Sequence, residues 1–338
     1  MLIKLFNHFR LTWRVANDKR VNLWLKLFLG GAPLVYAALP TPDDFLPVVG
    51  LLDEFVFLGL CTLIFTAASP MAVVNEHKRV IDGGGGNPGA DLDLYRYPSE
   101  QRDLASGFVI TFLLLILGGW YAGILGAILF GFGYLSAAIM RSRALSNAVQ
   151  VTENQLAHLH GPLRAAQRHL PHKTVELFVT QNPVLNAYTF GYGEPYTIIL
   201  TSALVERLTP EEIQAVIGHE LGHVHLGHAS LISLMSGLGG IARLLFYRWS
   251  RSCEYSADAI ALLASDGDPK PVVSSLLKLS SGLTDVSVDV DSFLRQADGE
   301  NGAAASVAEL TSTHPFMNNR IKNLVQQTSR LEVNEAYA

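Results

Sequence analysis

Charge and cysteine are scarce in this chain. Only 16% of its 338 residues are Asp, Glu, Lys or Arg, against roughly 25% in an ordinary soluble domain. Its two cysteines, Cys61 and Cys253, are too few for the disulfide framework of a small secreted protein. The formal net charge of -5 gives no general electrostatic attraction to nucleic acid, so no nucleic-acid partner is expected.

Long uncharged stretches accompany this low charge. The 37 residues from Leu104 to Met140 contain no Asp, Glu, Lys, Arg, His or Pro. As a helix they would extend about 55 Å, nearly twice the ~30 Å hydrocarbon thickness of a bilayer, so two crossings are more economical than one. The uncharged stretch 55–75 fits a single crossing, and a weaker third stretch, 21–40, has Lys26 near its start, where a lysine can reach the interface. We therefore expect a membrane region over 21–140 with about four helical spans, at 21–40, 55–75, 104–118 and 119–140.

The distribution of basic residues predicts the orientation of these spans. Six Lys or Arg residues lie among the first 26 residues, none lies in 40–54, and four lie in 76–103. The positive-inside rule then places the N-terminus and the 76–103 loop in the cytoplasm. Arg141 and Arg143 favour two crossings of 104–140, with the C-terminal half also cytoplasmic, whereas one crossing would leave it outside. Residues 1–20 are predicted to be a basic amphipathic segment, and 76–103 a glycine-rich polar loop.

From about residue 150 to 330 the pattern is that of an α+β, mainly helical domain. We expect a helix over 151–169 and strands over 174–180, 184–190 and 196–201. A further helix begins at Thr209, where Thr209 as N-cap, Pro210 at the first helical position and Glu212 form a capping box.

This capped helix carries the sequence His219-Glu220-Leu221-Gly222-His223. Histidines four residues apart project from one helix face about 6 Å apart, close enough to bind one Zn²⁺. Glu220 follows the first histidine and can reach a metal-bound water as general base. The pentapeptide therefore predicts a hydrolytic zinc site.

A catalytic zinc needs a third protein ligand. The metzincin pattern would require Gly at 226 and His at 229, but Leu226 and Ala229 occupy these positions. His225 and His228 are then expected on the polar face of the helix.

Glu254 and Asp258 are better candidates for the third ligand. Four residues apart, they share a helix face, which a helical hairpin can bring to the histidines. One carboxylate can bind the metal while the other accepts a hydrogen bond from a ligating histidine.

Five motifs in this order resemble the membrane zinc metallopeptidases of the HtpX and CAAX-prenyl-protease type, a gluzincin family. The motifs, spread over about 150–325, are Asn186-Ala187-Tyr188 with the strand at 196–202, Leu208–Ile213, the His-Glu-x-x-His helix, Glu254-x-x-x-Asp258, and Thr313-His314-Pro315 with Arg320. The resemblance implies a multi-pass α-helical membrane region followed by a gluzincin-type metallopeptidase domain.

The same resemblance implies a role for each motif residue. One Zn²⁺ per chain would be bound by His219, His223 and Glu254, with Glu220 as general base and Asp258 behind a ligating histidine. Asn186, Ala187 and Tyr188 would form an edge strand that pairs with an extended substrate, His314 would stabilise the transition state, and Arg320 would pair with substrate or with a nearby acidic residue.

The function implied is a membrane-bound zinc metalloendopeptidase that hydrolyses peptide bonds with a zinc-activated water. Its partners would be a protein or peptide substrate and the lipid bilayer, and a bacterial inner membrane is the favoured location. Membrane-protein quality control is the predicted role. Two alternatives stay open, namely processing of prenylated proteins and a non-catalytic, zinc-containing membrane scaffold or transporter.

Overall fold

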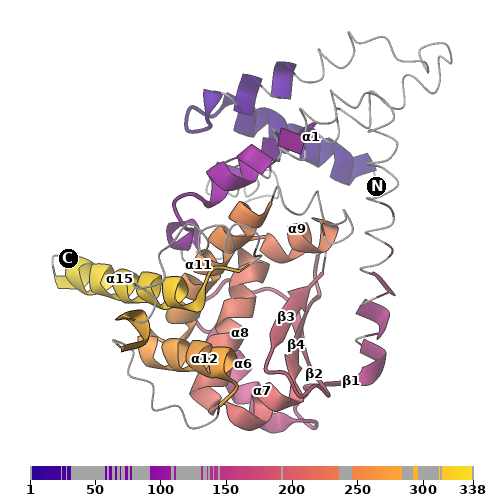
Figure 1. Cartoon of the computed structure of the whole chain (residues 1–338). Helices are drawn as coiled ribbons and strands as arrows, with labels where there is room; N and C mark the ends of the chain where they lie inside the picture. Colours follow the sequence, from indigo (N-terminus) through magenta and orange to yellow (C-terminus); the bar gives the residue numbers. More distant parts are fainter. Residues whose placement is uncertain are drawn as a thin grey trace. The chain divides into compact units, whose positions relative to one another are not determined.

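The computed structural model describes the chain in segments (Figure 1). The described residues are 2–31 apart from 24 and 28, scattered positions between 58 and 77, 92–107, scattered positions between 110 and 143, 145–191, 193–235, 246–283, 292–295, 312 and 314–336. No helix in these segments is both long and apolar enough to cross a bilayer. The predicted spans at 21–40, 55–75, 104–118 and 119–140 lie largely outside the described residues.

The chain divides into two units, Met1–Asp93 with Gln101–Gly123, and Leu94–Glu100 with Ile124–Ala338. In the first unit, the amphipathic segment predicted at the N-terminus forms helix α1 (Leu2–Asn17). The buried residue Val15 packs with Val21, Phe65 and Val73, while the Trp13 side chain is exposed. This apolar cluster joins α1 to the 65–74 segment.

The second unit contains a four-stranded sheet in the order β1-β2-β4-β3 (Figure 1). The strands are β1 (Ala148–Gln150), β2 (Val175–Thr180), β3 (Ala187–Phe190) and β4 (Tyr196–Thr201). β2 and β4 are parallel, whereas β1 and β3 run antiparallel to their neighbours. Every residue of β4 is buried, as expected for an apolar strand in the middle of a sheet, and β3 forms an edge.

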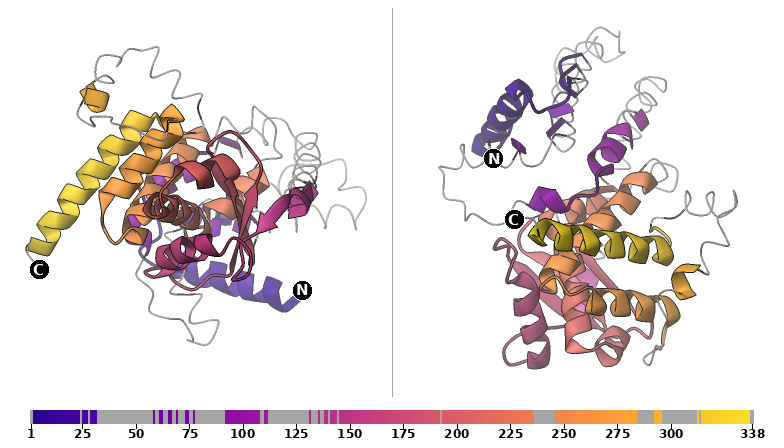
Figure 2. Two further views of the ribbon diagram at one scale, coloured as in Figure 1. Left: turned by 90° about the horizontal axis from the view of Figure 1, so that it is seen from below. Right: turned by 90° about the vertical axis from the view of Figure 1, so that its left-hand side faces the viewer.

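Helices make up most of the second unit. They are η3 (Ala157–Leu159), α6 (His160–Gln167), α7 (Ser202–Arg207), α8 (Pro210–His225), α9 (His228–Met235), α11 (Tyr247–Ala264), α12 (Pro269–Ser281) and α15 (Met317–Ala336), and the 3₁₀ helix η2 (Leu92–Tyr95) spans the boundary between the units. Figures 1 and 2 show α12 and α15 on the side of α8 away from the sheet.

The helix predicted over 151–169 is shorter in the structure. Thr152 and Gln155 form a β-bridge, and the continuous α-helix starts only at His160. Pro162 lies in the first turn of α6, where a missing N–H is tolerated, whereas in the middle of a longer helix it would break a hydrogen bond.

The capping box predicted at the start of α8 is confirmed. The Thr209 hydroxyl accepts a hydrogen bond from the Glu212 backbone N–H, and the Glu212 carboxylate accepts one from the Thr209 N–H at 2.8 Å. Glu212 also accepts a hydrogen bond from the Lys278 ammonium group at 2.8 Å. The N-terminus of α8 is thereby joined to α12.

Two glycines allow α8 to lie close against α11. A Cβ atom at Gly218 would come within 2.5 Å of the Ala264 Cβ, and one at Gly222 within 2.9 Å of the Ala257 Cα. The glycines are four residues apart and so share one face of α8. Because His219 and His223 each follow one of these glycines, the close contact brings both histidines to α11.

Replacing Gly222 with alanine will test this close contact. The new methyl group meets backbone, which cannot rotate away, so we expect a loss of about 1–3 kcal/mol in the free energy of unfolding. Thermal unfolding of the purified chain measures the effect. The control is Gly161→Ala, an exposed position of α6 with nothing within 4 Å of the added Cβ, where stability should stay equal or rise. Equal unfolding temperatures for wild type and Gly222→Ala would contradict the close contact.

Candidate metal centre

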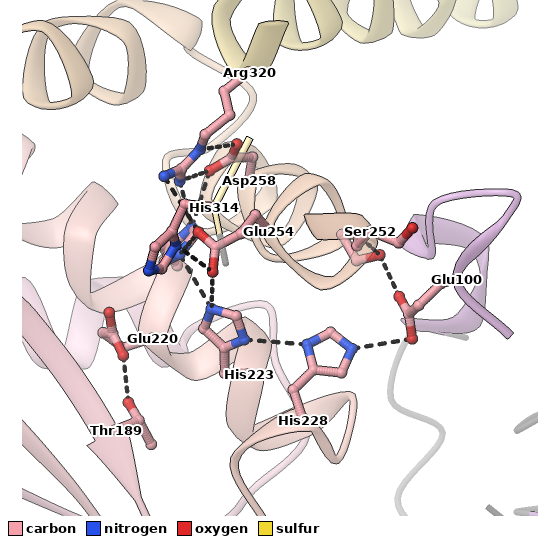
Figure 3. A network of polar contacts seen from close by, with 12 residues as sticks. Glu100, Thr189, Glu220, His223, His228, Ser252, Glu254, Asp258, His314 and Arg320 are labelled. Atoms are coloured by element: carbon pink, nitrogen blue, oxygen red, sulfur yellow. Dashed lines mark hydrogen bonds and ion pairs between the residues drawn. The ribbon is translucent and has the colours of Figure 1, made fainter. Parts of the chain in front are cut away.

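Three side chains from α8 and α11 converge on one point (Figure 3). The Nε2 atoms of His219 and His223 lie 3.2 Å apart, and the Glu254 carboxylate oxygens lie 3.5 Å from His219 Nε2 and 3.6 Å from His223 Nε2. All three side chains are largely withdrawn from solvent. The predicted metal ligands are therefore brought together in space.

The spacing of these atoms fits a metal ion of zinc's size. Ligand atoms about 2.0–2.1 Å from a tetrahedral metal are roughly 3.3 Å from one another. The two histidine nitrogens are 3.2 Å apart, and the nearest Glu254 oxygen is 3.5 Å (Oε2) from His219 Nε2 and 3.6 Å (Oε1) from His223 Nε2, all close to that value. Two imidazole nitrogens and one carboxylate are also a common set of ligands at catalytic zinc.

Asp258 and Arg320 hold His219 in place. The Asp258 Oδ1 lies 2.9 Å from His219 Nδ1, which leaves Nε2 of the ring directed at Glu254. Arg320 donates two hydrogen bonds to the Asp258 carboxylate, at 2.6 and 2.9 Å, and its Nη1 lies 3.2 Å from Glu254. The sequence left two partners open for Arg320, a substrate or a nearby acidic residue, and the structure shows Arg320 paired with acidic residues. Burial would raise the pKa of Asp258, but the Arg320 charge outweighs it and holds that pKa below its usual value.

Glu220 lies on the side of the cluster that faces strand β3 (Figure 3). Its buried carboxylate accepts a hydrogen bond of 2.6 Å from the Thr189 hydroxyl. Burial raises the pKa of Glu220 above the ordinary value for a glutamate. Thr189 was not among the residues predicted from the sequence, because only the packing of β3 against α8 brings it to Glu220.

The remaining predicted residues also lie at or near this site. His314, in the segment before α15, has Nδ1 3.1 Å from the Glu254 Oε1 while 64% of its side chain is exposed. The negative charge of Glu254 raises the pKa of His314. Ala187 and Tyr188 begin the edge strand β3, and Asn186 directly precedes it. Their roles with substrate belong to the proposed function.

The expectation that His228 lies on the polar face of a helix is wrong. Its side chain is 1% exposed, and its Nδ1 lies 3.2 Å from His223 Nδ1. The expectation assumed that one continuous helix carries His223 and His228. In the structure, α8 ends at His225, and Gly227, with φ of +81°, turns the chain before α9 begins at His228. A glycine directly after a helix is a stop signal that the sequence does contain.

We expect Asp258→Asn to weaken metal binding. The amide keeps the size of the side chain but loses the charge that Arg320 neutralises, and changes behind a metal ligand typically reduce affinity about 10- to 100-fold. Competition for Zn²⁺ with a coloured chelator measures the effect. Asp266→Asn, at an exposed position after α11, is the matched control. Equal affinities for the two variants would contradict a role for Asp258 at the metal site.

The proteins that are similar in sequence to this chain include a metallopeptidase and a protease, in agreement with the geometry of the candidate metal centre. Over 234 residues the chain is 36% identical to the plastoglobule-localized metallopeptidase 48 of Arabidopsis thaliana, covering 64% of each chain. A protease HtpX homologue of Helicobacter pylori is 29% identical over 225 residues, which cover 55% of this chain and 69% of that protein. The chain thus spans just under two thirds of the length of the plant relative.

A structural comparison extends over nearly the whole chain but is weaker. The crystal structure of S. mikatae Ste24p matches with a TM-score of 0.40 and 16% sequence identity, covering 96% of both chains. The profile of peptidase family M48, however, matches residues 152–246 and 230–328, which together are more than half of the chain and include every residue of the cluster. The chain belongs to peptidase family M48.

Proposed function

We propose that this chain is a zinc metalloendopeptidase. The observation that carries the proposal is that Glu254 of α11 converges with His219 and His223 beside Glu220. The two histidines and Glu220 lie on α8, which packs against the edge strand β3. When bound, zinc supplies a Lewis acid that activates water and polarises the peptide carbonyl. The M48 membership and the metallopeptidase and protease names of the relatives support this assignment.

The other roles in hydrolysis are assigned to residues of the chain itself. Glu220, with a pKa raised by burial, takes a proton from the attacking water and passes it to the leaving amine. His314 has Nδ1 3.1 Å from the Glu254 Oε1, so its ring lies beside the proposed metal site, where an N–H of the imidazole can donate to the developing oxyanion. Ala187 and Tyr188 begin the edge strand and Asn186 precedes it. No strand among the described residues covers the outer side of β3, which can pair with the backbone of an extended peptide.

A structural zinc site is the less suitable interpretation of the cluster. Structural zinc is normally enclosed by four protein ligands. His228 reaches only the Nδ1 side of His223, away from the Nε2 atoms of the cluster, and Cys253 groups instead with His228 and Glu100. Among the described residues, neither therefore serves as a fourth ligand.

Substitution of Glu220 by glutamine will test the catalytic assignment. Loss of a general base costs about 10²–10⁴ in rate, so cleavage of an unfolded protein such as casein should fall by that factor. Chelation of the metal should abolish cleavage, and added Zn²⁺ should restore it.

Glu211→Gln is the matched control for this substitution. Glu211 lies on the same helix, in its exposed first turn, and should leave the rate unchanged. Zinc content must be measured in each variant. Equal cleavage by wild type and Glu220→Gln, with zinc bound in both, would refute the mechanism.

We further propose that the chain is a multi-pass membrane protein whose uncharged 104–140 stretch crosses twice. Leu94–Glu100, just before that stretch, belongs to the same unit as the peptidase domain that follows it. The Tyr97 backbone N–H donates to Ser256 at 2.8 Å, and the Ser99 and Ser252 hydroxyls lie 3.1 Å apart. Two ends of a stretch that join one folded unit lie on one side of a membrane, which supports an even number of crossings.

Labelling of single cysteines in intact cells with a membrane-impermeant thiol reagent will test this topology. Gly85→Cys and Ser142→Cys, before and after the stretch, should react only after permeabilisation, whereas Gly119→Cys should react in intact cells. The native cysteines Cys61 and Cys253 are buried, so their background should be low. Opposite labelling of Gly85→Cys and Ser142→Cys would indicate a single crossing and contradict the proposal.

The biological role that best fits these features is the degradation of unfolded or damaged membrane proteins. An edge strand recognises any extended backbone, so substrates need only be locally unfolded. We place the chain in a bacterial inner membrane with its catalytic domain in the cytoplasm. Neither alternative, processing of prenylated proteins or a non-catalytic membrane scaffold, is favoured by the residues around the site.

A further inference from the structure

A second buried cluster lies directly behind the candidate metal ligands. It consists of Glu100, His228 and Cys253, all of them buried. Both ring nitrogens of His228 have partners: Nδ1 lies 3.2 Å from His223 Nδ1, and Nε2 lies 3.0 Å from the Glu100 Oε1. Figure 3 shows the resulting chain of contacts from His223 through His228 to Glu100.

The geometry of the contacts between His223, His228 and Glu100 determines which ring nitrogens carry protons. His223 directs Nε2 at His219 and Glu254, so a metal bound there requires Nε2 to be free of a proton. The proton of the neutral ring is then on Nδ1, which needs an acceptor. Nδ1 of His228 can accept it only if His228 carries its own proton on Nε2, which faces Glu100. One arrangement of protons therefore satisfies both the contact between the two rings and the contact between His228 and Glu100.

The Glu100 carboxylate is itself firmly held. It forms an ion pair with Arg96 and accepts a hydrogen bond from the Ser256 hydroxyl. Arg96 also donates a hydrogen bond of 2.7 Å to the Leu226 carbonyl, next to the turn between α8 and α9. The Glu100 carboxylate, the last acceptor in this chain of contacts, is thus held by Ser256 of α11 and, through Arg96, by the turn between α8 and α9.

The two histidine ligands are held by parallel arrangements. His219 contacts a carboxylate, Asp258, which is bound by an arginine of α15. His223 reaches a carboxylate, Glu100, through the ring of His228, and that carboxylate is also bound by an arginine. The extra imidazole bridges the longer distance on this side.

We propose that His228 and Glu100 are positioning residues that set the tautomer and ring orientation of the metal ligand His223. This inference rests on the proposed metal site. Partners that accept the outer N–H of a ligating histidine increase its affinity for the metal, and their loss typically costs about 10- to 100-fold. Glu100, far from the histidines in sequence, thereby becomes part of the peptidase site.

A second metal ion held by Glu100, His228 and Cys253 is the competing interpretation. The Arg96 guanidinium already pairs with Glu100, and its Nη1 lies 3.5 Å from His228 Nε2. A metal ion at that position would have to displace this positive charge. His228 Nδ1 is also engaged with His223. The contacts therefore favour positioning over metal binding.

Two substitutions of His228 distinguish the effect of losing its hydrogen bonds from the effect of changing its volume. Leucine fills the space but accepts no hydrogen bond, whereas the side-chain oxygen of asparagine can take the place of Nδ1 as acceptor. We expect His228→Leu to bind Zn²⁺ about 10- to 100-fold more weakly, and His228→Asn to regain most of this loss. Glu100→Gln should fall between them. His225→Leu, near the end of α8, is the matched control and should bind Zn²⁺ like the wild type.

Competition with a coloured chelator measures these affinities on the whole chain. The visible absorption of the Co²⁺-substituted protein should shift in His228→Leu and return in His228→Asn, an effect that altered packing alone would not produce. Unfolding temperatures of the metal-free variants identify any that fail to fold, and in that case Glu100→Gln provides the affinity test.

Three results would overturn the inference. The first is equal affinity and an unchanged Co²⁺ spectrum in folded His228→Leu. The second is a wild-type content of two metal ions per chain that falls to one in Glu100→Gln, which would show a second metal site. The third is a wild-type chain that binds no Zn²⁺, which would also end the proposed function, whereas the first two leave that function intact.

Discussion

The rest of the second unit depends on ion pairs between buried carboxylates and arginine. Glu254 and Asp258 are almost inaccessible to solvent, and both contact Arg320. An ionised carboxylate in the protein interior costs several kcal/mol unless it is paired and hydrogen-bonded. Arg320 provides that compensation, because one planar guanidinium donates to both oxygens of Asp258 while its third nitrogen faces Glu254. Without it, α11 could not present two carboxylates beside the histidines of α8.

The same requirement connects distant parts of the chain to the site. Arg320 lies on α15, after the peptidase core, while Glu100 with its partner Arg96 lies before it. The two carboxylates Asp258 and Glu100 then fix His219 directly and His223 through one further ring. The candidate ligands are thus held by both ends of the unit, so metal binding and folding would stabilise one another.

Sequence alone predicted the features that are encoded locally. The capping box of α8, the pairing of His219 with His223 four residues later, and the strand over 196–201 depend on neighbours within a few residues, and all three appear in the structure. The packing of α11 against α8, which brings Glu254 to them, was also expected, because Glu254 and Asp258 are four residues apart and share a helix face that a helical hairpin can bring to the histidines. The interruption at Gly227 was missed, and with it the buried position of His228.

The contacts that sequence could not predict are those between distant segments. Thr189 and Glu100 carry no pattern that distinguishes them from other polar residues, and their partners lie 31 and 128 residues away. A threonine in a strand or a glutamate at the start of a helix is ordinary until packing buries it beside an unsatisfied group. Both became recognisable only through the short distances that join them to Glu220 and His228.

In the proposed function, the hydrogen bond between Thr189 and Glu220 would link substrate recognition to chemistry. Successive residues of a strand point to opposite faces, so Thr189 faces α8 while its neighbour Tyr188 faces away and is partly exposed. The strand that would pair with a substrate backbone thus also holds the carboxylate that would accept the proton. A peptide bound along β3 has its position relative to Glu220 fixed by strand register, with no need for a side-chain pocket. Such a site would select for an available backbone, which a folded protein hides and a damaged one exposes.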